Sequence, residues 1–248
     1  MLKDRDVFLF DLDGTLLNIE VDEFLKYYFG ALSQKFNDLC ENQDQFIKVL
    51  SKSTEKMIKN DGSKTNQQAF MEDFMQRIGI KEKKEARKIK ERFDNFYQRE
   101  FTELDKYFEL DKETPSYIIN YLKRKGKKLV LATNPLFPVE AVEARLKWVN
   151  IDPNDFELIT NYENMSYAKP NPDYYKEILE KISENPENCL MVGNDLSEDA
   201  VASKLGIKTL IIENKLIERR QEDKKADLNI AWQGSLNEFK NLIEEKIK

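Results

Sequence analysis

The chain has 248 residues, of which 40% are hydrophobic and 35% charged, with a net charge of -6 and no histidine. This composition is typical of a folded globular protein rather than of a disordered chain. The absence of histidine excludes Ser-His-Asp and Cys-His catalysis, histidine-ligated zinc and haem held by a proximal histidine. The two cysteines, Cys40 and Cys189, cannot build a disulfide framework or an all-cysteine zinc site. Any chemistry must therefore use carboxylates, hydroxyls, lysines or a hard metal ion.

Charge and hydropathy also limit the partners of the protein. The first residues are charged and contain no long apolar segment, which predicts the absence of a signal peptide. The longest apolar runs, such as Val7–Phe10, have the length of a strand and are far shorter than a membrane span. The mild acidity argues against nucleic-acid binding, which requires a basic surface. We expect a cytoplasmic protein that binds neither membrane nor nucleic acid, and the oligomeric state stays open.

The first predicted element is a buried strand at Val7–Phe10, which ends in Asp11. Residues 19–106 then lack a comparable strand pattern, and their apolar residues recur at steps of three and four, as on one face of a helix. The clearest run comprises Val21, Leu25, Tyr28, Leu32, Phe36 and Leu39. Gly62 and Gly79 mark the ends of helices in this stretch. We predict an all-helical segment built from several amphipathic helices.

From about residue 113 onward, predicted helices and strands alternate. The helices are expected at 115–125, 139–149, 174–182, 198–205 and 236–247, and the strands at 128–132, 156–160, 189–192 and 208–212. Repeated strand–helix units indicate a parallel sheet that is covered by helices on both faces. The fold class is therefore α/β, and the helical segment is predicted to be an insertion after the first strand.

Polar residues follow the predicted strands at the edge where parallel α/β sheets bind their ligands. They are Asp11-Leu12-Asp13-Gly14-Thr15 after the first strand, Thr133-Asn134 after the second, Lys169-Pro170 after the third, and Gly193-Asn194-Asp195 after the fourth, with Asp199 just beyond. We expect the fold to bring these side chains together.

Two carboxylates two residues apart need a turn to reach one site. A tight turn at Gly14 would let Asp11 and Asp13 do so. Together with the acidic cluster at 194–195, they would form an oxygen-only pocket that suits Mg²⁺. Without compensation these carboxylates would raise one another's pKa, and a divalent cation and a lysine would relieve that repulsion.

The ordered set of motifs resembles the haloacid dehalogenase (HAD) superfamily, in particular its phosphoglycolate-phosphatase-like branch. The matching residues are the Asp-x-Asp-Gly-Thr motif at 11–15, Thr133, Lys169 before a proline, and the acidic cluster at 193–199. The resemblance covers essentially the whole chain. It implies a Rossmann-like catalytic core at 1–16 and 107–248, with a helical cap domain at 17–106 inserted after the first strand.

The resemblance also implies a role for each of these residues. Asp11 is expected to attack phosphorus and form an aspartyl-phosphate, while Asp13 acts as the general acid and base. Thr133, Lys169 and backbone groups near Leu12 and Asn134 would hold the phosphoryl oxygens. The implied Mg²⁺ ligands are Asp11, the backbone carbonyl of Asp13, and a residue after the fourth strand.

That last ligand is where the chain departs from the family pattern. Many members have Asp directly after the glycine of the fourth strand, whereas this chain has Asn194 followed by Asp195. An amide oxygen ligates hard cations without contributing charge, so either residue, or both, would complete the site. Asp199 would either support Lys169 or stabilise the start of the next helix, and Asn134 would bind phosphate or serve only as a turn former.

The expected activity is Mg²⁺-dependent hydrolysis of a small phosphorylated metabolite, such as a sugar phosphate, phosphoglycolate or a nucleoside monophosphate. Alternatives are a non-enzymatic binding protein with the same fold, a phosphomutase, a phosphonatase or a dehalogenase. Asp13 counts against a dehalogenase, and the lack of histidine counts against a phosphoglucomutase-like enzyme. Tyr162 and Tyr167, which precede Lys169, are candidates for the entrance of the site.

Overall fold

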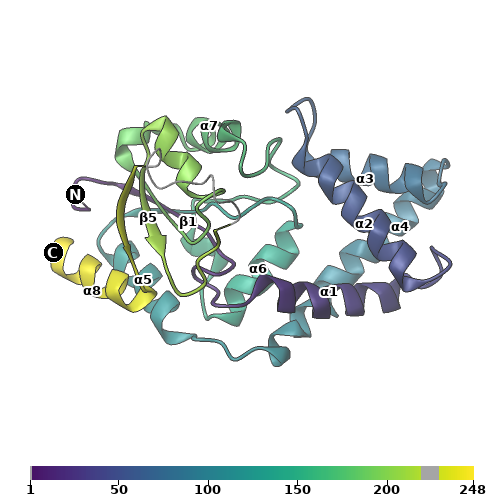
Figure 1. Cartoon of the computed structure of the whole chain (residues 1–248), viewed down its shortest axis with the longest axis horizontal. Coiled ribbons are helices and arrows are strands. Elements are labelled where there is room, and N and C mark those ends of the chain that lie inside the picture. The colour runs from purple at the N-terminus through teal and green to yellow at the C-terminus, as the bar shows by residue number, and fades with distance from the viewer. Residues whose placement is uncertain (1, 219–228) are drawn as a thin grey trace.

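The computed structural model describes residues 2–218 and 229–248, which form a six-stranded parallel sheet flanked by helices (Figure 1). The strands are β1 (Val7–Phe10), β2 (Lys128–Leu131), β3 (Leu158–Ile159), β4 (Cys189–Gly193), β5 (Lys208–Ile212) and β6 (Ile230–Gly234), in the spatial order β3-β2-β1-β4-β5-β6. All paired strands are parallel, so the predicted α/β class is confirmed. The central position of β1 brings its carboxyl end between those of β2 and β4, the geometry that a shared site requires.

Alternating side chains of the strands pack against different helices on the two faces of the sheet. On one face, Phe8 and Phe10 of β1 pack with α5 (Glu113–Arg124), α6 (Val139–Trp148) and α8 (Leu236–Lys246). On the other, Val7 and Leu9 pack with α7 (Pro172–Ile182) and with the 3-10 helix η4 (Ala200–Leu205). Because both faces are covered, β1 is apolar at every position, as its sequence predicts.

The remaining long helices form a bundle beside the sheet and the helices that cover it (Figure 1). They are α1 (Val21–Lys35), α2 (Gln43–Ile58), α3 (Asn66–Arg77) and α4 (Lys83–Gln98), and we call them the helical bundle. The shorter 3-10 helices are η1 (Phe101–Tyr107), η2 (Pro153–Asp155) and η3 (Pro186–Asn188). In the part of the chain that the structure describes, no helix is long and apolar enough to cross a bilayer.

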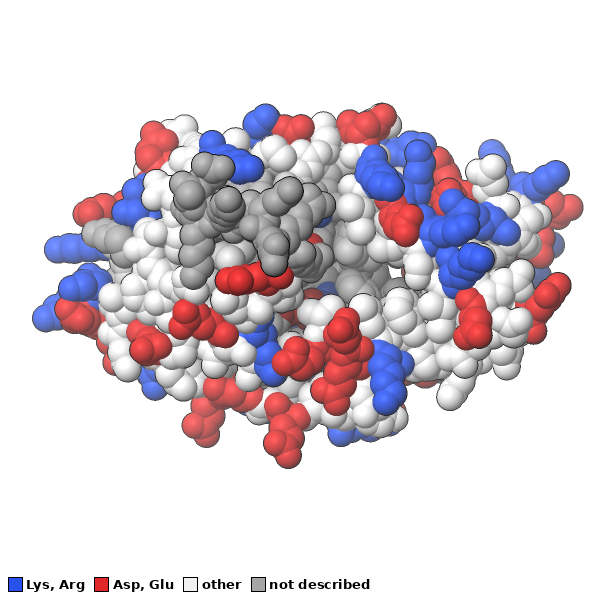
Figure 2. Space-filling model, viewed as in Figure 1, with Lys and Arg blue, Asp and Glu red and all other residues white. Residues whose placement is uncertain are grey.

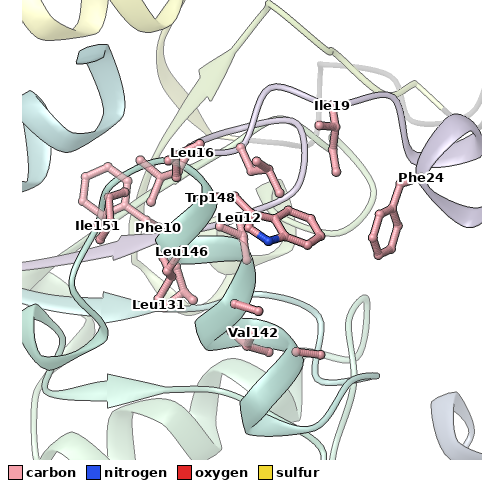
Figure 3. Packing of buried hydrophobic residues seen from close by; sticks show 14 of the residues in the cluster. Phe10, Leu12, Leu16, Ile19, Phe24, Leu131, Val142, Leu146, Trp148 and Ile151 are labelled. Carbon is pink, nitrogen blue, oxygen red and sulfur yellow. The ribbon is translucent and has the colours of Figure 1, made fainter. Parts of the chain in front are cut away.

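A continuous apolar core joins the bundle to the sheet. Figure 3 shows Phe10 and Leu131 of the sheet next to Leu146 of α6, with Trp148 on the same helix facing Phe24 of α1. The rings of Phe24 and Trp148 have centroids 6.5 Å apart in an edge-on arrangement, which is favourable for aromatic pairs. The two parts of the molecule therefore share one hydrophobic cluster near the carboxyl end of the strands.

A second connection joins the start of α3 to the loop after β3. The backbone N–H of Asn66 donates to the carbonyl of Met165 at 2.8 Å, and that of Gln67 donates to the carbonyl of Tyr162 at 2.7 Å. The fully buried side chain of Asn66 adds a bond of 3.1 Å to the carbonyl of Tyr167. Asn60 reaches the same loop through the carbonyl of Ser166, at 2.8 Å. We call this set of bonds the α3 attachment.

The structure differs from the sequence prediction in several local features. The strand expected at 156–160 comprises only Leu158–Ile159, and the helix expected from residue 174 begins at Pro172. The helix expected at 198–205 is the shorter 3-10 helix η4, in which the hydroxyl of Ser203 bonds the carbonyl of Ala200, three residues earlier. The helix expected from Pro115 begins two residues earlier, at Glu113. β6 was not predicted because only its last residue, Gly234, is buried and its other residues show no clear alternation of apolar and polar side chains.

Candidate active site

A buried lysine lies between two carboxylates at the carboxyl end of β1. The Nζ atom of Lys169 is 2.8 Å from Oδ1 of Asp11 and 2.6 Å from Oδ1 of Asp199. Lys169 and Asp199 are each 1% exposed, whereas Asp11 is 8% exposed and lines a cavity. A fully buried ammonium group requires partners of this kind, because leaving it unpaired would be strongly destabilising.

The electrostatics of these three groups are coupled. Burial raises the pKa of Asp11 to about 8, although Lys169 acts in the opposite direction. Burial alone would lower the pKa of Lys169, but Asp11 and Asp199 together raise it well above its usual value. Lys169 therefore stays charged, and additional positive charge near Asp11 would favour its ionised, nucleophilic form.

The turn after β1 is built by its own backbone. The carbonyl of Leu12 accepts hydrogen bonds from the N–H groups of Thr15, at 3.2 Å, and Leu17, at 2.8 Å. Gly14 has φ +83°, and a Cβ there would lie 2.2 Å from Nδ2 of Asn194. Glycine at this position thus permits both the reversal of the chain and the close approach of the loop after β4.

The loop after β4 is organised by Asp199. One oxygen of its carboxylate binds Lys169, and the other accepts bonds of 2.9 Å from the backbone N–H groups of both Asn194 and Asp195. A Cβ at Gly193 would lie 2.2 Å from that second oxygen, so glycine leaves the space that the carboxylate occupies. Asp199 thus contacts Lys169 directly, which is the first of the two roles that the sequence left open.

Asn194 and Asp195 differ in what their side-chain oxygens contact. The Oδ1 atom of Asn194 is 3.1 Å from the hydroxyl of Thr15, which in turn lies 3.5 Å from Oδ2 of Asp11. The Oδ1 atom of Asp195 instead accepts bonds from the N–H and hydroxyl of Ser197 and from the N–H of Glu198, at 2.7 to 3.1 Å. The amide oxygen of Asn194 is therefore linked to Asp11 through the hydroxyl of Thr15, whereas Oδ1 of Asp195 closes a turn.

Thr133 and Asn134, in the loop that follows β2, line the same cavity as Asp11. The carbonyl of Thr133 accepts bonds from the hydroxyls of Thr160, at 2.7 Å, and Tyr174, at 2.8 Å, which fixes the end of the strand. The side-chain amide of Asn134 donates to Glu198 at 3.0 Å. Asn134 thus connects the loops after β2 and β4, a contact that the sequence did not predict.

Arg145 of α6 is a site residue that the sequence analysis missed. Its side chain is fully buried, forms an ion pair with Oδ2 of Asp13, and stacks on Phe137 at 4.6 Å from the ring centroid. The Oδ1 atom of Asp13 is buried and has no hydrogen-bond partner among the described residues. The signal in the sequence was a charged residue between apolar residues of a helix that packs on the sheet, which is rare unless the charge is paired.

A cavity of about 440 Å³ extends from these residues into the helical bundle. At one end it is lined by Asp11, Asp13 and Thr133, and at the other by side chains of α1, α2, α3 and α4. Tyr162 lines it as well, whereas Tyr167 lies against Gly62 and is not part of the wall. This arrangement can hold a small molecule with one end on the polar cluster and the other among the bundle helices.

The oxygens around Asp11 suit a hard cation better than a soft one. Within residues 2–218 and 229–248, no three Cys, Asp or Glu side chains are grouped as a metal site. Asp11 and Asn194 nevertheless present a carboxylate and an amide oxygen on either side of Thr15, and the local carboxylates outnumber Lys169 and Arg145. The donor set therefore fits Mg²⁺ if phosphate, water and backbone oxygens complete the coordination.

Comparisons with known proteins agree with this geometry. A family model of haloacid dehalogenase-like hydrolases matches residues 5–206. The pyrophosphatase PpaX of Bacillus mycoides (strain KBAB4) is 22% identical over 204 residues, which is 82% of this chain and 81% of the relative. A phosphorylated carbohydrates phosphatase of Thermotoga maritima is 28% identical over 151 residues, which is 57% of this chain and 68% of that protein.

Solved structures share the whole architecture. A predicted phosphoglycolate phosphatase from Haemophilus somnus 129pt has a TM-score of 0.58 at 17% identity, covering 98% of this chain and 99% of its own. A HAD phosphatase from Thermococcus onnurineus has a TM-score of 0.55 at 17% identity, covering 98% of this chain and 100% of its own. At these identities the similarity concerns the fold.

Proposed function

Because the chain belongs to the haloacid dehalogenase-like hydrolases, we propose that it is a phosphatase that hydrolyses small phosphate monoesters through an aspartyl-phosphate intermediate. The observation that carries the proposal is the buried contact of Lys169 with Asp11, at the polar end of the cavity. The relatives described as phosphatases support the same reaction class. In this proposal residues 17–106 form a cap over a catalytic core of residues 1–16 and 107–248.

The first step is the transfer of the phosphoryl group to Asp11. A carboxylate oxygen of Asp11 attacks phosphorus, and the bond between phosphorus and the ester oxygen breaks. Lys169, which already contacts Asp11, neutralises negative charge on the carboxylate and on the transferring group. Thr133 and backbone N–H groups near Leu12 and Asn134 hold the phosphoryl oxygens.

Asp13 exchanges the protons in both steps. Its Oδ2 atom is held by Arg145, and Oδ1 has no hydrogen-bond partner among the described residues, so Oδ1 is the atom that carries the proton. Asp13 gives this proton to the leaving oxygen. It then accepts a proton from the water that attacks the aspartyl-phosphate, which releases inorganic phosphate and restores Asp11.

The residues that would hold Mg²⁺ are Asp11, the backbone carbonyl of Asp13, and Asn194. Bound Mg²⁺ supplies charge neutralisation for the phosphoryl group and for the crowded carboxylates. We favour Asn194 over Asp195 as the direct ligand because the hydroxyl of Thr15 links the amide oxygen of Asn194 to Asp11, whereas Oδ1 of Asp195 closes the turn at Ser197.

This assignment predicts different effects for two substitutions. Asn194→Ala removes an oxygen ligand and is expected to raise the Mg²⁺ concentration for half-maximal activity by about tenfold or more. Asp195→Asn keeps an oxygen that can accept the turn bonds, so the Mg²⁺ requirement is expected to change by less than about threefold. A magnesium titration of activity for both variants makes the comparison. The reverse order of effects would assign the ligand to Asp195.

The function itself is tested with p-nitrophenyl phosphate. We expect hydrolysis in MgCl₂, its loss in EDTA and its recovery when Mg²⁺ is restored. We also expect beryllium fluoride with Mg²⁺ to give a protein-bound fluorine signal in NMR, as a mimic of the phosphorylated Asp11. Hydrolysis that is unaffected by EDTA, or the absence of both hydrolysis and the bound signal, would contradict the proposal. The second result would favour the alternative of a non-enzymatic binding protein.

A further inference from the structure

We infer that the substrate is a phosphate monoester of a hydrophobic alcohol or phenol, rather than of a sugar, a hydroxy acid or a nucleoside. The inference rests on the proposed function and adds the class of leaving group. Its basis is the wall of the cavity that leads away from Asp11.

The cavity wall beyond the polar cluster is predominantly apolar. α1 contributes Phe24 and Leu25, α2 contributes Leu50 and Ile58, and Phe137 of the loop after β2 completes the wall near the reacting groups. Phe24 and Leu50 are each 3% exposed, so these surfaces are deep in the protein rather than on its exterior. A leaving group seated here exchanges water for aliphatic and aromatic contacts.

The polar groups of this wall are already engaged or lie at its edge. The hydroxyls of Tyr28 and Tyr97 bond each other at 2.7 Å, and burial raises the pKa of Tyr28 to about 12. The hydroxyl of Thr54 donates to the carbonyl of Leu50 in its own helix, at 3.0 Å. Ser51 and Glu55 line the cavity but are exposed to solvent, which places them at the rim. Several hydroxyls of a sugar would therefore lose water without gaining partners, which is unfavourable.

Charge also disfavours a substrate with a second anionic group. None of the described residues that line the cavity is Lys or Arg, whereas Glu55 and Glu198 both line it. The Lys and Arg side chains that gather on the outer surface over α2 and α3 in Figure 2 are not among the residues that line the cavity. A carboxylate or a second phosphate in the cavity would therefore meet carboxylates or apolar atoms.

The volume suits a leaving group of moderate size. About 440 Å³ lies within the range of about 300–1,000 Å³ typical of small-molecule sites. Phosphoglycolate or an ethyl ester would leave much of this apolar space without contacts. A longer alkyl chain or an aromatic ring would fill it.

The first test is a series of n-alkyl phosphates from ethyl to octyl, with 3-phosphoglycerate and glucose 6-phosphate for comparison. We expect kcat/KM to rise by up to about fourfold per added methylene until the cavity is full, which corresponds to about 0.8 kcal/mol per methylene. Hexyl phosphate should exceed both polar esters by at least about tenfold. A flat or falling series, or a preference for either polar ester, would overturn the inference.

A matched pair of variants tests where the alkyl chain of the substrate binds. Leu25 lines the cavity, whereas Leu39 is also partly buried but lies outside it. Leu25→Asn is expected to reduce the gain per methylene to less than about twofold. Leu39→Asn should leave the gain per methylene as in the parent protein. An equal gain in kcat/KM per methylene in the Leu25 variant and the parent protein would place the alkyl chain elsewhere.

Binding of alkylphosphonates, which carry a P–C bond that phosphatases of this kind do not hydrolyse, separates this inference from the proposed function. By calorimetry with the unmodified protein and Mg²⁺, we expect tighter binding and a more negative heat-capacity change with each added methylene. Binding of this kind without hydrolysis of any ester would keep the inference and defeat the proposed function. Hydrolysis of the esters, with rates and affinities that do not depend on chain length, would support the proposed function and overturn the inference.

Discussion

Asp11→Asn is expected to lower kcat with p-nitrophenyl phosphate by about 10⁴-fold or more while the protein stays folded. An amide oxygen does not replace a carboxylate as the nucleophile, and loss of a nucleophile removes nearly all covalent catalysis. Folding should survive because Lys169 keeps its bond to Asp199 and because burial already disfavours the charged form of Asp11. The measurements are initial rates and a thermal melt monitored by circular dichroism.

The matched control is Asp173→Asn on α7. Asp173 is an aspartate that pairs with Lys176 at the surface, with about half of each side chain exposed, so its substitution should leave both rate and melting temperature nearly unchanged. An Asp11→Asn variant that retains more than about a tenth of the parental kcat would rule out Asp11 as the nucleophile.

The largest effect on stability is expected from Arg145→Met. The guanidinium group of Arg145 is fully buried and paired with Asp13, so its removal leaves a partly buried carboxylate without its partner. Breaking a buried pair in this way costs about 3 kcal/mol, which corresponds to a fall of roughly 6–12 °C in the melting temperature of a domain of this size. Activity should also fall, and it should fall further with alkyl phosphates than with p-nitrophenyl phosphate. An alkoxide is a poor leaving group and therefore depends more on protonation by Asp13.

A double variant distinguishes loss of the pair from loss of packing. Asp13→Asn combined with Arg145→Met removes both charges, so part of the lost stability should return relative to Arg145→Met alone. Arg87→Met is the control: Arg87 forms an exposed pair with Glu91 on α4, and its substitution should change the free energy of unfolding by less than about 0.5 kcal/mol. Equal stability of Arg145→Met and the parent protein would mean that the ion pair contributes nothing.

The sequence predicted those parts of the fold and of the site that are encoded in short stretches of neighbouring residues. The continuous apolar run of β1 and the polar residues that follow the strands are local features, and parallel topology then brings distant positions together. Lys169 and Asp11, 158 positions apart in the chain, lie 2.8 Å apart for this reason. The confirmed α/β fold follows from the same repeated strand–helix pattern.

Features that depend on long-range packing could not be predicted in this way. The apolar neighbours of Arg145 indicate that its charge is paired, but only the packing of α6 shows that the partner is Asp13. Asn134 could be assigned only as a turn former or phosphate ligand, because its contact with Glu198 depends on the distance between two loops. The apolar cavity wall has the same origin: Phe24 and Leu50 show the spacing of any amphipathic helix, and only the packing of α1 and α2 reveals which apolar side chains leave space between them.

The α3 attachment determines how the bundle can move relative to the sheet. Its four hydrogen bonds connect one end of α3 and the adjoining loop to residues 162–167, which lie directly before Lys169. Any swing of the bundle that preserves these bonds must use this edge as its pivot, so the widest gap opens at the opposite side. A rigid-body opening would thus admit a ligand without displacing the segment that leads to the catalytic lysine.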